Sequence, residues 1–188
     1  VLFITPFYGF PDSSLEEKKD TRQWEFLFEE TPFLTYKEKG KEHSYKAVGT
    51  MKENFFEVLA VASDLDRRPE WVPNLIITKK IEGDLEKEAL LYEKFYFPWP
   101  AKNRDAILQC KIKRNQERKE LLIEFQIATH KKHPPYKDIV RVPVTVGKMY
   151  FKYINETTTK ALYEIEFDPG GALPDFILNM FIKKAPLD

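Results

Sequence analysis

The most reactive side chains in this sequence are two histidines and a single cysteine. His130 and His133 flank two lysines, and histidines three residues apart share a metal ion only with further ligands nearby. No Cys, Asp or Glu is clustered beside them, so the pattern favours a solvated loop and we expect no metal site. Cys110 alternates with Leu108 and Ile112 along an apolar stretch, which favours a buried thiol over a nucleophile.

The sequence has no motif for covalent catalysis or phosphate binding. It contains neither a Gly-Xaa-Ser-Xaa-Gly nucleophile elbow nor a glycine-rich phosphate loop, and its carboxylates are too numerous to mark an acid–base pair. Thirty basic and thirty acidic residues leave the 188-residue chain without net charge, which argues against nucleic acid as the main partner. We therefore expect no catalytic residue, no cofactor and no nucleic-acid partner.

The elements that must position these residues are mostly strands. Apolar residues recur at every second position, and short turn-like segments separate the runs, which predicts an antiparallel meander because parallel pairing needs long crossovers. The predicted strands are 24–29, Phe33–Lys37, Tyr45–Met51, Leu75–Ile81, Ala89–Phe97, Ala106–Lys113, Leu121–Thr129, Ile139–Val146, Met149–Ile154 and Lys160–Phe167.

Three helices are predicted among these strands. A charged one spans Leu15–Arg22, and a second begins at Asn54 and ends near residues 64–68. The proline-rich stretch around Trp71 fits a loop or a short turn. The third follows the Asp168-Pro169-Gly170-Gly171 turn, where the two glycines allow backbone angles that other residues resist and could act as a hinge. Its apolar positions are Leu173, Phe176, Ile177, Met180 and Phe181.

This order of elements predicts an α+β fold in which a curled sheet presents an apolar concave face. On the last strand, Ala161, Tyr163, Ile165 and Phe167 alternate with more polar neighbours. The terminal helix is the obvious cover for that face. Few helices and a large concave sheet suggest a cavity, although a core filled by side chains remains the alternative.

Three separated pieces of the sequence, in this order, resemble a START domain, the lipid-transfer module related to the steroidogenic acute regulatory protein. They are Trp71, the segment Tyr92–Asp105 with its Pro-Trp-Pro and Asn-Arg-Asp motifs, and Asp168-Pro169-Gly170-Gly171 through Pro174 with its helix. The resemblance runs from about Trp24 to the C-terminus and is strongest to the phosphatidylcholine transfer branch. It implies a helix-grip fold, in which the sheet wraps the C-terminal helix and a lipid lies between them.

The resemblance also suggests head-group residues, and several positions depart from the family's pattern. Sterol-binding members carry a buried acid–arginine pair where this chain has Leu91 and Cys110. Phosphatidylcholine-binding members carry an arginine, matched by Arg68, and an aspartate four residues later, where this chain has Val72. An anionic head-group contact by Arg68 would survive this change, whereas a choline contact by the aspartate would not. A solvated helix-end arginine is the alternative for Arg68.

Arg104 is the second head-group candidate, beside Asp105. Adjacent side chains on a strand point to opposite faces, so an ion pair that fixes the loop is the favoured alternative for these two residues. Trp71 and Trp99 lie beside prolines and could dip into a membrane interface. The candidates for the cavity wall and its lid are Trp71, Leu91, Cys110, Tyr163, Phe176, Ile177, Met180 and Phe181.

The sequence thus predicts a non-enzymatic protein that binds, and transfers or senses, a lipid or other apolar molecule in an internal tunnel, with transient contact to membrane surfaces. We expect an N-terminal segment and helix over residues 1–23 and one lipid-binding domain over 24–188. The uncharged N-terminus favours a soluble, cytoplasmic protein over an exported one. Two alternatives remain open: a cyclase or aromatase of the helix-grip superfamily, and a ligand-gated protein-interaction module.

Overall fold

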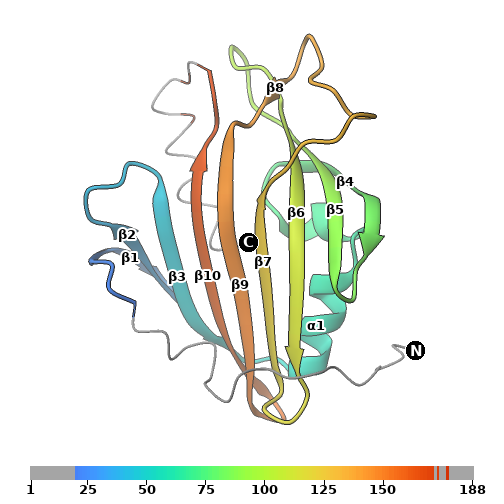
Figure 1. The fold of residues 1–188 in the computed structure, drawn as a ribbon. Coiled ribbons are helices and arrows are strands. Elements are labelled where there is room, and N and C mark those ends of the chain that lie inside the picture. The colour runs from blue at the N-terminus through green and yellow to red at the C-terminus, as the bar shows by residue number, and fades with distance from the viewer. Residues whose placement is uncertain (1–19, 172, 174–176, 178–188) are drawn as a thin grey trace.

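The structure is a computed structural model that describes residues 20–171, Leu173 and Ile177. Within that part of the chain, ten strands form one sheet and two helices lie on one side of it (Figure 1). The elements are β1 Trp24–Glu30, β2 Phe33–Glu38, β3 Ser44–Met51, α1 Phe55–Ser63, α2 Arg68–Trp71, β4 Leu75–Asp84, β5 Glu88–Phe95, β6 Arg104–Asn115, β7 Glu120–Ile127, β8 Val140–Arg141, β9 Val144–Asn155 and β10 Thr158–Asp168.

The sheet confirms the predicted antiparallel curl and adds one long-range pairing. The strand order is β1-β2-β3-β10-β9-β7-β6-β5-β4, and the two-residue β8 pairs with β6 in parallel. The strands from β4 to β10 therefore follow one another as a meander, whereas β10 closes on β3 from the first part of the chain. The helices connect β3 to β4 along the concave side of the sheet.

Two boundary predictions were wrong, and both have a local cause. The predicted break near Val146 does not exist, because β9 runs straight through Gly147. A Cβ atom at Gly147 would collide with the Glu164 carbonyl oxygen and the Phe125 ring, so the glycine marks a close approach rather than a turn. At the other end, residues 20–22 are not helical, and the remainder of the predicted helix at Leu15–Arg22 lies outside the described residues.

Helix α1 forms where the sequence predicts it. The Asn54 side chain accepts a hydrogen bond from the Phe56 backbone N–H at 2.8 Å, which caps the first turn. The Asn54 amide also donates to the Glu156 carbonyl at 2.8 Å, which ties the helix start to the turn between β9 and β10. Phe55, Val58 and Ala62 are buried at helical spacing and face the sheet.

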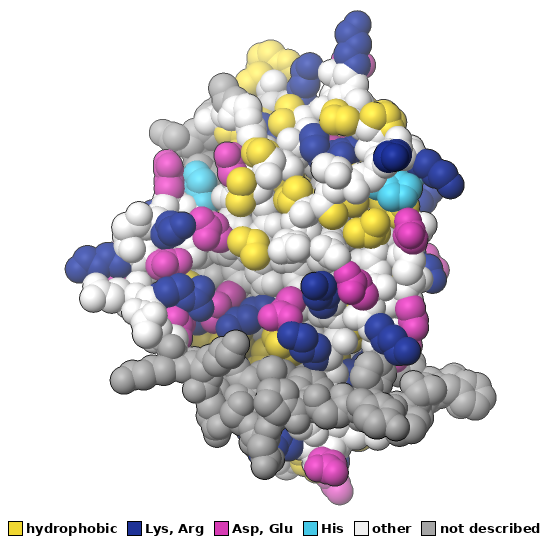
Figure 2. All heavy atoms as spheres, in the orientation of Figure 1, with side chains coloured by type: hydrophobic (Ala, Val, Ile, Leu, Met, Phe, Trp, Pro, Cys, Tyr) yellow, Lys and Arg dark blue, Asp and Glu magenta, His cyan; other side chains and the backbone are white. Residues whose placement is uncertain are grey.

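The outer face of the sheet carries a row of alternating charges. Lys111, Glu124, Lys148 and Glu164 are successive cross-strand neighbours on β6, β7, β9 and β10. Glu164 is buried and holds both Lys148, at 3.3 Å, and Arg22, at 2.6 Å. Figure 2 shows this face with cationic and anionic side chains interspersed. Cross-strand ion pairs of this kind help to fix the register of the strands.

No helix of the described residues is long and apolar enough to cross a membrane.

Candidate functional site

The concave side of the sheet lines a cavity of about 700 Å³. This volume lies within the range of about 300–1,000 Å³ that small-molecule sites occupy. Strands β3, β5–β7, β9 and β10 supply one wall, and α1 and α2 supply the other. The structure therefore favours a cavity over a filled core. The predicted inward residues Tyr163 and Cys110 line it, as do Ile165 and Phe167.

Most of the wall is apolar, because the inward positions of the strands are. Leu108, Phe125, Met149, Phe151 and Ala161 come from four neighbouring strands and face the same space. Helix α1 contributes Val58, Val61 and Ala62 from the opposite side. A wall of this kind accommodates a hydrocarbon chain at little free-energy cost, because it offers that chain few competing polar groups.

One ion pair interrupts this apolar wall. Arg68 opens α2 and Glu93 lies on β5, and Arg68 Nη2 is 2.9 Å from Glu93 Oε1. The two side chains retain 12% and 3% of their exposure, so the pair is almost fully withdrawn from water. The Arg68 guanidinium also lies 5.3 Å from the centre of the Trp71 ring. Arg68 is therefore neither solvated nor a lone cation.

The polar atoms around this pair are incompletely hydrogen-bonded. Arg68 Nε, Trp71 Nε1 and Glu93 Oε1 are buried and find no hydrogen-bond partner in the described part of the chain. The 2.9 Å contact of Glu93 is thus an ion pair by distance without hydrogen-bond geometry. Buried polar groups in folded proteins are usually paired, and these three lie together beside the cavity, while others, such as Thr35 Oγ1 and Glu120 Oε1, lie elsewhere in the fold.

Sequence reasoning missed Glu93, although the sequence held a signal for it. On the predicted strand Ala89–Phe97, the inward positions Ala89, Leu91 and Phe95 share a face with Glu93. A carboxylate on an otherwise apolar strand face needs a buried partner. The partner could not be identified, because Arg68 is 25 positions away on a different kind of element.

The cavity's thiol and phenol are both held in their protonated forms. Burial raises the pKa of Cys110 to about 12, and the nearby Glu93 carboxylate adds to this rise. Burial likewise raises the pKa of Tyr163 well above its ordinary value. A neutral thiol is a poor nucleophile, so the location of Cys110 agrees with its interpretation as a buried residue.

Arg104 lines the same cavity but is engaged by the backbone. Its Nη2 donates to the Gly170 carbonyl at 3.0 Å and its Nε to the Pro169 carbonyl at 3.3 Å, while its Nη1 donates to Lys102. The guanidinium lies 4.4 Å from the Phe97 ring centre, and burial lowers its pKa. Arg104 therefore fastens the loop before β6 to the turn after β10.

Asp105 points the other way, as strand geometry requires. It is fully buried and accepts two hydrogen bonds from Arg141 of β8, at 2.7 and 3.1 Å. The ion pair expected between Arg104 and Asp105 is therefore absent from the described structure. Asp105 instead pairs with Arg141, 36 positions along the chain. Asn103 completes the motif, because its side chain accepts the Phe97 N–H at 3.0 Å.

The remaining predicted site residues lie in different places. Leu91 is buried in the hydrophobic core and is not among the described residues that line the cavity. Gly170 and Gly171 both have a φ of +67°, in the left-handed region that suits glycine. Ile177 is helical and fully buried. Phe176, Met180 and Phe181, with most of the predicted terminal helix, lie outside the described residues.

The two histidines form no metal site within the part of the chain that the structure describes. His130 Nε2 lies 3.3 Å from Glu82, and the His133 ring stacks on Tyr92 with 5.7 Å between ring centres. The pair therefore belongs to the packing of a loop against β4 and β5.

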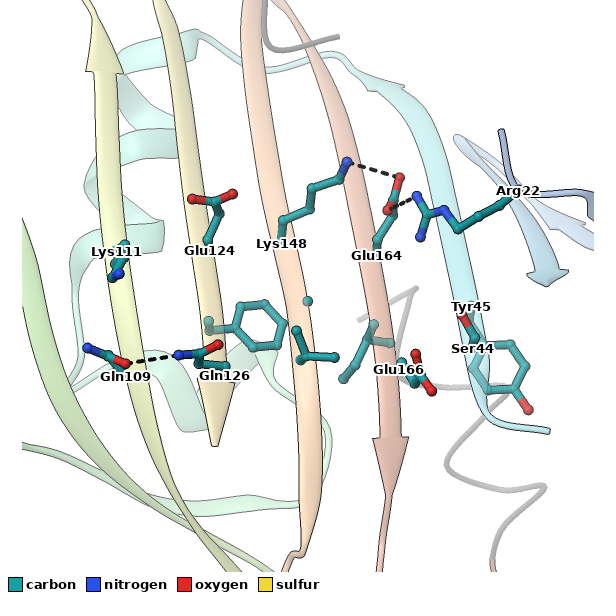
Figure 3. A pocket seen from close by; sticks show the side chains of 14 residues that line it. Arg22, Ser44, Tyr45, Gln109, Lys111, Glu124, Gln126, Lys148, Glu164 and Glu166 are labelled. Carbon is teal, nitrogen blue, oxygen red and sulfur yellow. Dashed lines mark hydrogen bonds and ion pairs between the residues drawn. The ribbon is translucent and has the colours of Figure 1, made fainter. Parts of the chain in front are cut away.

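A second hollow, of about 460 Å³, lies on the outer face of the sheet. Figure 3 shows its polar side chains, with Glu164 bridged to both Lys148 and Arg22 and Gln109 bonded to Gln126. Glu124 and Glu166 are also paired, with Lys113 and Lys41 beside the hollow. This hollow is accordingly a feature of the salt-bridged face, whereas the unpaired atoms of Arg68, Trp71 and Glu93 lie at the concave cavity.

Comparison with known proteins identifies relatives of this architecture. A family model described as START domain matches residues 13–187. Human START domain-containing protein 10 is 30% identical over 131 residues, which are 68% of this chain and 42% of that protein. The chain thus spans less than half the length of that relative.

Two solved structures share the fold. Human StAR-related lipid transfer protein 5 superposes with a TM-score of 0.76 at 17% identity, over 92% of this chain and 85% of that one. A STAR-related lipid transfer protein fragment from Xanthomonas axonopodis gives a TM-score of 0.72 at 18% identity, over 87% and 92% of the two chains. At these identities the similarity shows the fold alone.

Proposed function

The chain belongs to the START domain family, and on that premise we propose that it binds a lipid in the concave cavity and transfers it between membranes or senses it. The observation that carries the proposal is the apolar cavity of about 700 Å³ between the sheet and α1. The two solved structures named above are of lipid transfer proteins, which supports the same class of ligand. The comparisons do not single out the family's phosphatidylcholine transfer branch.

Such a carrier needs no energy source. Each buried CH₂ contributes about 0.8 kcal/mol whether its surroundings are a bilayer or a protein interior, so moving a lipid tail from one to the other is nearly neutral. The protein supplies a cavity that shields the lipid tail from water while the lipid moves between two membranes. The rate is then set by opening of the cavity, which is a gating motion.

Catalysis is a weaker candidate for this cavity, because the titratable groups buried in its wall are poorly suited to proton transfer. Glu93 is held against Arg68 in an ion pair, and the Cys110 thiol and Tyr163 phenol both have raised pKa values. A general base near neutral pH needs a pKa close to the working pH and room to reach a substrate proton. A binding site has no such need.

We propose that the protein contacts membranes through the loop between β5 and β6. Trp99 at that loop is 89% exposed, and Tyr96 beside it is half exposed. Exposed aromatic rings with a polar edge suit the membrane interface. Trp71, the other tryptophan considered for this role, instead lines the cavity and has a buried indole N–H.

Native mass spectrometry tests the binding proposal directly. Delipidated protein is incubated with mixed-lipid vesicles and then separated from them. We expect adducts with the masses of lipids, whereas apo protein alone would contradict lipid binding. Ala161→Phe, which projects a ring into the cavity, should reduce the adducts several-fold. Val146→Phe, on the exposed outer face of the adjacent strand, is the matched control and should leave them unchanged.

A further inference from the structure

We propose that the two edges of the sheet bind each other between molecules, so that β1 of one molecule pairs with β4 of a second copy. This inference concerns the rim of the sheet and does not depend on lipid binding. Within the described residues, β1 pairs only with β2 and β4 only with β5, so each strand has one side free for a further strand. Figure 1 shows these two strands on opposite sides of the molecule. Free strand edges of this kind can pair with another chain.

The two edge strands carry opposite charges without partners. Glu29 and Glu30 end β1, and Lys79 and Lys80 lie in the middle of β4. All four side chains are exposed, and none forms an ion pair within the described part of the chain. Charges usually protect an edge, because like charges meet when two copies of the same strand come together. They protect β1 against β1 and β4 against β4, but they attract β1 to β4.

The direction of the strands allows β1 and β4 to join with the same face outward. Eight antiparallel pairings separate the two strands in the sheet, so β1 and β4 run in the same direction along this order. A second copy that continues the sheet with its concave face on the same side therefore places its β4 parallel to β1. In a parallel ladder, paired residues share a face, so a matching register must suit both faces of the sheet.

The two glutamates present one charge to each face of β1, because consecutive residues on a strand point to opposite sides. Glu30 is the cross-strand neighbour of Phe33, which lines the cavity. Glu30 therefore lies on the concave side of the sheet and Glu29 on the outer side. The β1 edge thus offers a carboxylate to a partner on both of its faces.

The two lysines of β4 match this arrangement. Lys80 is the cross-strand neighbour of Leu91, which packs into the core, so Lys80 lies on the concave side and Lys79 on the outer side. A register that pairs Glu29 with Lys79 pairs Glu30 with Lys80 as well. One alignment therefore joins opposite charges on both faces of the combined sheet.

Apolar side chains beside the charges fit the same register. Phe26 and Leu27 of β1 are exposed, and this register places them opposite Ile76, which is also exposed, and Ile77. A bulge at Leu27 and another at Ile76 each add one residue, so neither strand moves out of step with the other. Burial of these side chains would supply the apolar part of the contact.

Sedimentation velocity at low salt tests the contact. The wild type should form dimers and longer chains as its concentration rises about a hundredfold, because a contact between two different edges always leaves one edge of each kind free. Raising the salt concentration about tenfold shortens the Debye length about threefold and should shift the distribution back towards the monomer. A monomer at every concentration would overturn the proposal.

Charge reversal identifies the two edges. The β1 variant carries Glu29→Lys and Glu30→Lys, and it should associate about tenfold or more weakly than the wild type, because like charges then meet. The β4 variant carries Lys79→Glu and Lys80→Glu and should lose association to the same extent. The chain with all four substitutions should regain association, because opposite charges face each other again. Its net charge equals that of the wild type, so net charge cannot explain the recovery.

The matched control carries Lys131→Glu and Lys132→Glu in an exposed loop. It changes the net charge by as much as the β4 variant does, yet it should associate as the wild type does. Circular dichroism checks that each variant is folded, which we expect because all the substituted side chains are exposed.

Cysteine cross-linking tests the register. Cys110 is the only cysteine of the chain and is buried, so introduced thiols report the contact between molecules. Glu29→Cys protein is mixed with Lys79→Cys protein and oxidised. We expect a disulfide-linked heterodimer to form several-fold faster than in a mixture of Glu29→Cys with Lys131→Cys, because only the first pair is held within disulfide distance. Equal rates would contradict this register.

The charge-reversal outcomes have separate meanings, and all of them leave lipid binding untouched. Association that neither the β1 variant nor the β4 variant weakens would place the contact elsewhere and overturn the proposal. Weakening in only one of the two variants would show that the affected edge binds a different surface. Failure of the four-substitution chain to recover would show that the charges of β1 and β4 do not meet.

Discussion

At the residue scale, Arg104 joins two backbone segments, the loop before β6 and the turn after β10. Its guanidinium is 2% exposed and donates to the carbonyls of Lys102, Pro169 and Gly170. Buried carbonyls that lose such a donor remain unsatisfied, which makes truncation more costly than the hydrogen bonds themselves. The family motif suggests that Arg104 contacts a head group. In this geometry, Arg104 instead holds the turn after β10 in place.

Arg104→Met should therefore lower the free energy of unfolding by about 3 kcal/mol or more, since two to three buried hydrogen bonds to a charged group are lost. Urea denaturation followed by circular dichroism measures this change. Arg67→Met, which removes an exposed arginine paired with Glu70, is the control and should cost less than about 1 kcal/mol. Equal effects of the two substitutions would show that the hydrogen bonds of Arg104 do not stabilise the fold.

Trp99→Ala should weaken binding to anionic and zwitterionic vesicles several-fold without affecting stability, because the side chain is 89% exposed. Vesicle co-sedimentation measures the binding. Ile154→Ala removes a half-exposed apolar side chain at the opposite end of the sheet, where β9 turns into β10, and should have no effect (Figure 1). Unchanged co-sedimentation of Trp99→Ala would contradict membrane contact through Trp99.

At the scale of elements, the Gly170-Gly171 turn remains the proposed hinge of the terminal lid. Both glycines have a φ of +67°, so proline, whose φ is fixed near −65°, cannot replace either one without moving the turn. Alanine distinguishes the two positions. Its Cβ would lie 2.9 Å from Pro143 at position 170, whereas nothing lies closer than 3.8 Å at position 171.

Gly171→Ala should slow lipid exchange between vesicles by a few-fold, because a left-handed alanine costs about 1 kcal/mol and biases the turn away from this conformation. Gly171→Asn is the control, since asparagine tolerates this backbone region better and should restore most of the rate. Exchange of a fluorescent lipid between donor and acceptor vesicles measures both. Identical exchange rates in the wild type and both variants would contradict the proposed hinge at this turn.

The segment before β1 is tied to the sheet through Asp20. Burial opposes ionisation of this carboxylate, but hydrogen bonds from Arg22 and the Trp24 indole N–H outweigh it and hold its pKa below the ordinary value. Because the folded-state pKa is the lower one, the stability that Asp20 contributes is fully present above about pH 4 and is lost as the pH falls further.

Asp20→Asn should accordingly destabilise the protein by about 1 kcal/mol at pH 7, with a smaller difference from the wild type near pH 2.5. Urea denaturation at the two pH values measures it. Asp66→Asn, at an exposed position, serves as the control. A pH-independent deficit in Asp20→Asn would assign its effect to packing rather than to charge.

For the whole molecule, a ligand that fills the cavity should raise the melting temperature. Binding at one hundred times the dissociation constant contributes about 2.7 kcal/mol, which corresponds to roughly 5–10 °C for a domain of this size. Differential scanning fluorimetry with oleyl alcohol measures the shift. Ala161→Phe, with its partly filled cavity, should show a smaller rise, and an equal rise would locate the ligand outside the cavity.

The sequence predicts local features of the fold well and long-range ones poorly. Alternation of apolar residues located most strands, and Asn54 marked the start of α1, because both signals are local. The pairing of β10 with β3 and the ion pair of Arg68 with Glu93 join residues that no local pattern connects. The strand boundary predicted at Val146 was wrong, because β9 continues through Gly147, a glycine that close packing between strands requires.

The position of β10 in the sheet has a consequence for biosynthesis. This strand follows every other strand in the described chain, yet it joins β3 to β9 and so connects the two halves of the sheet. A nascent chain emerges from the ribosome N-terminus first, so the two halves remain separate until β10 has been made. Under the proposed function, a ligand that needs the cavity wall from both halves of the sheet is therefore acquired only after β10 has been synthesised.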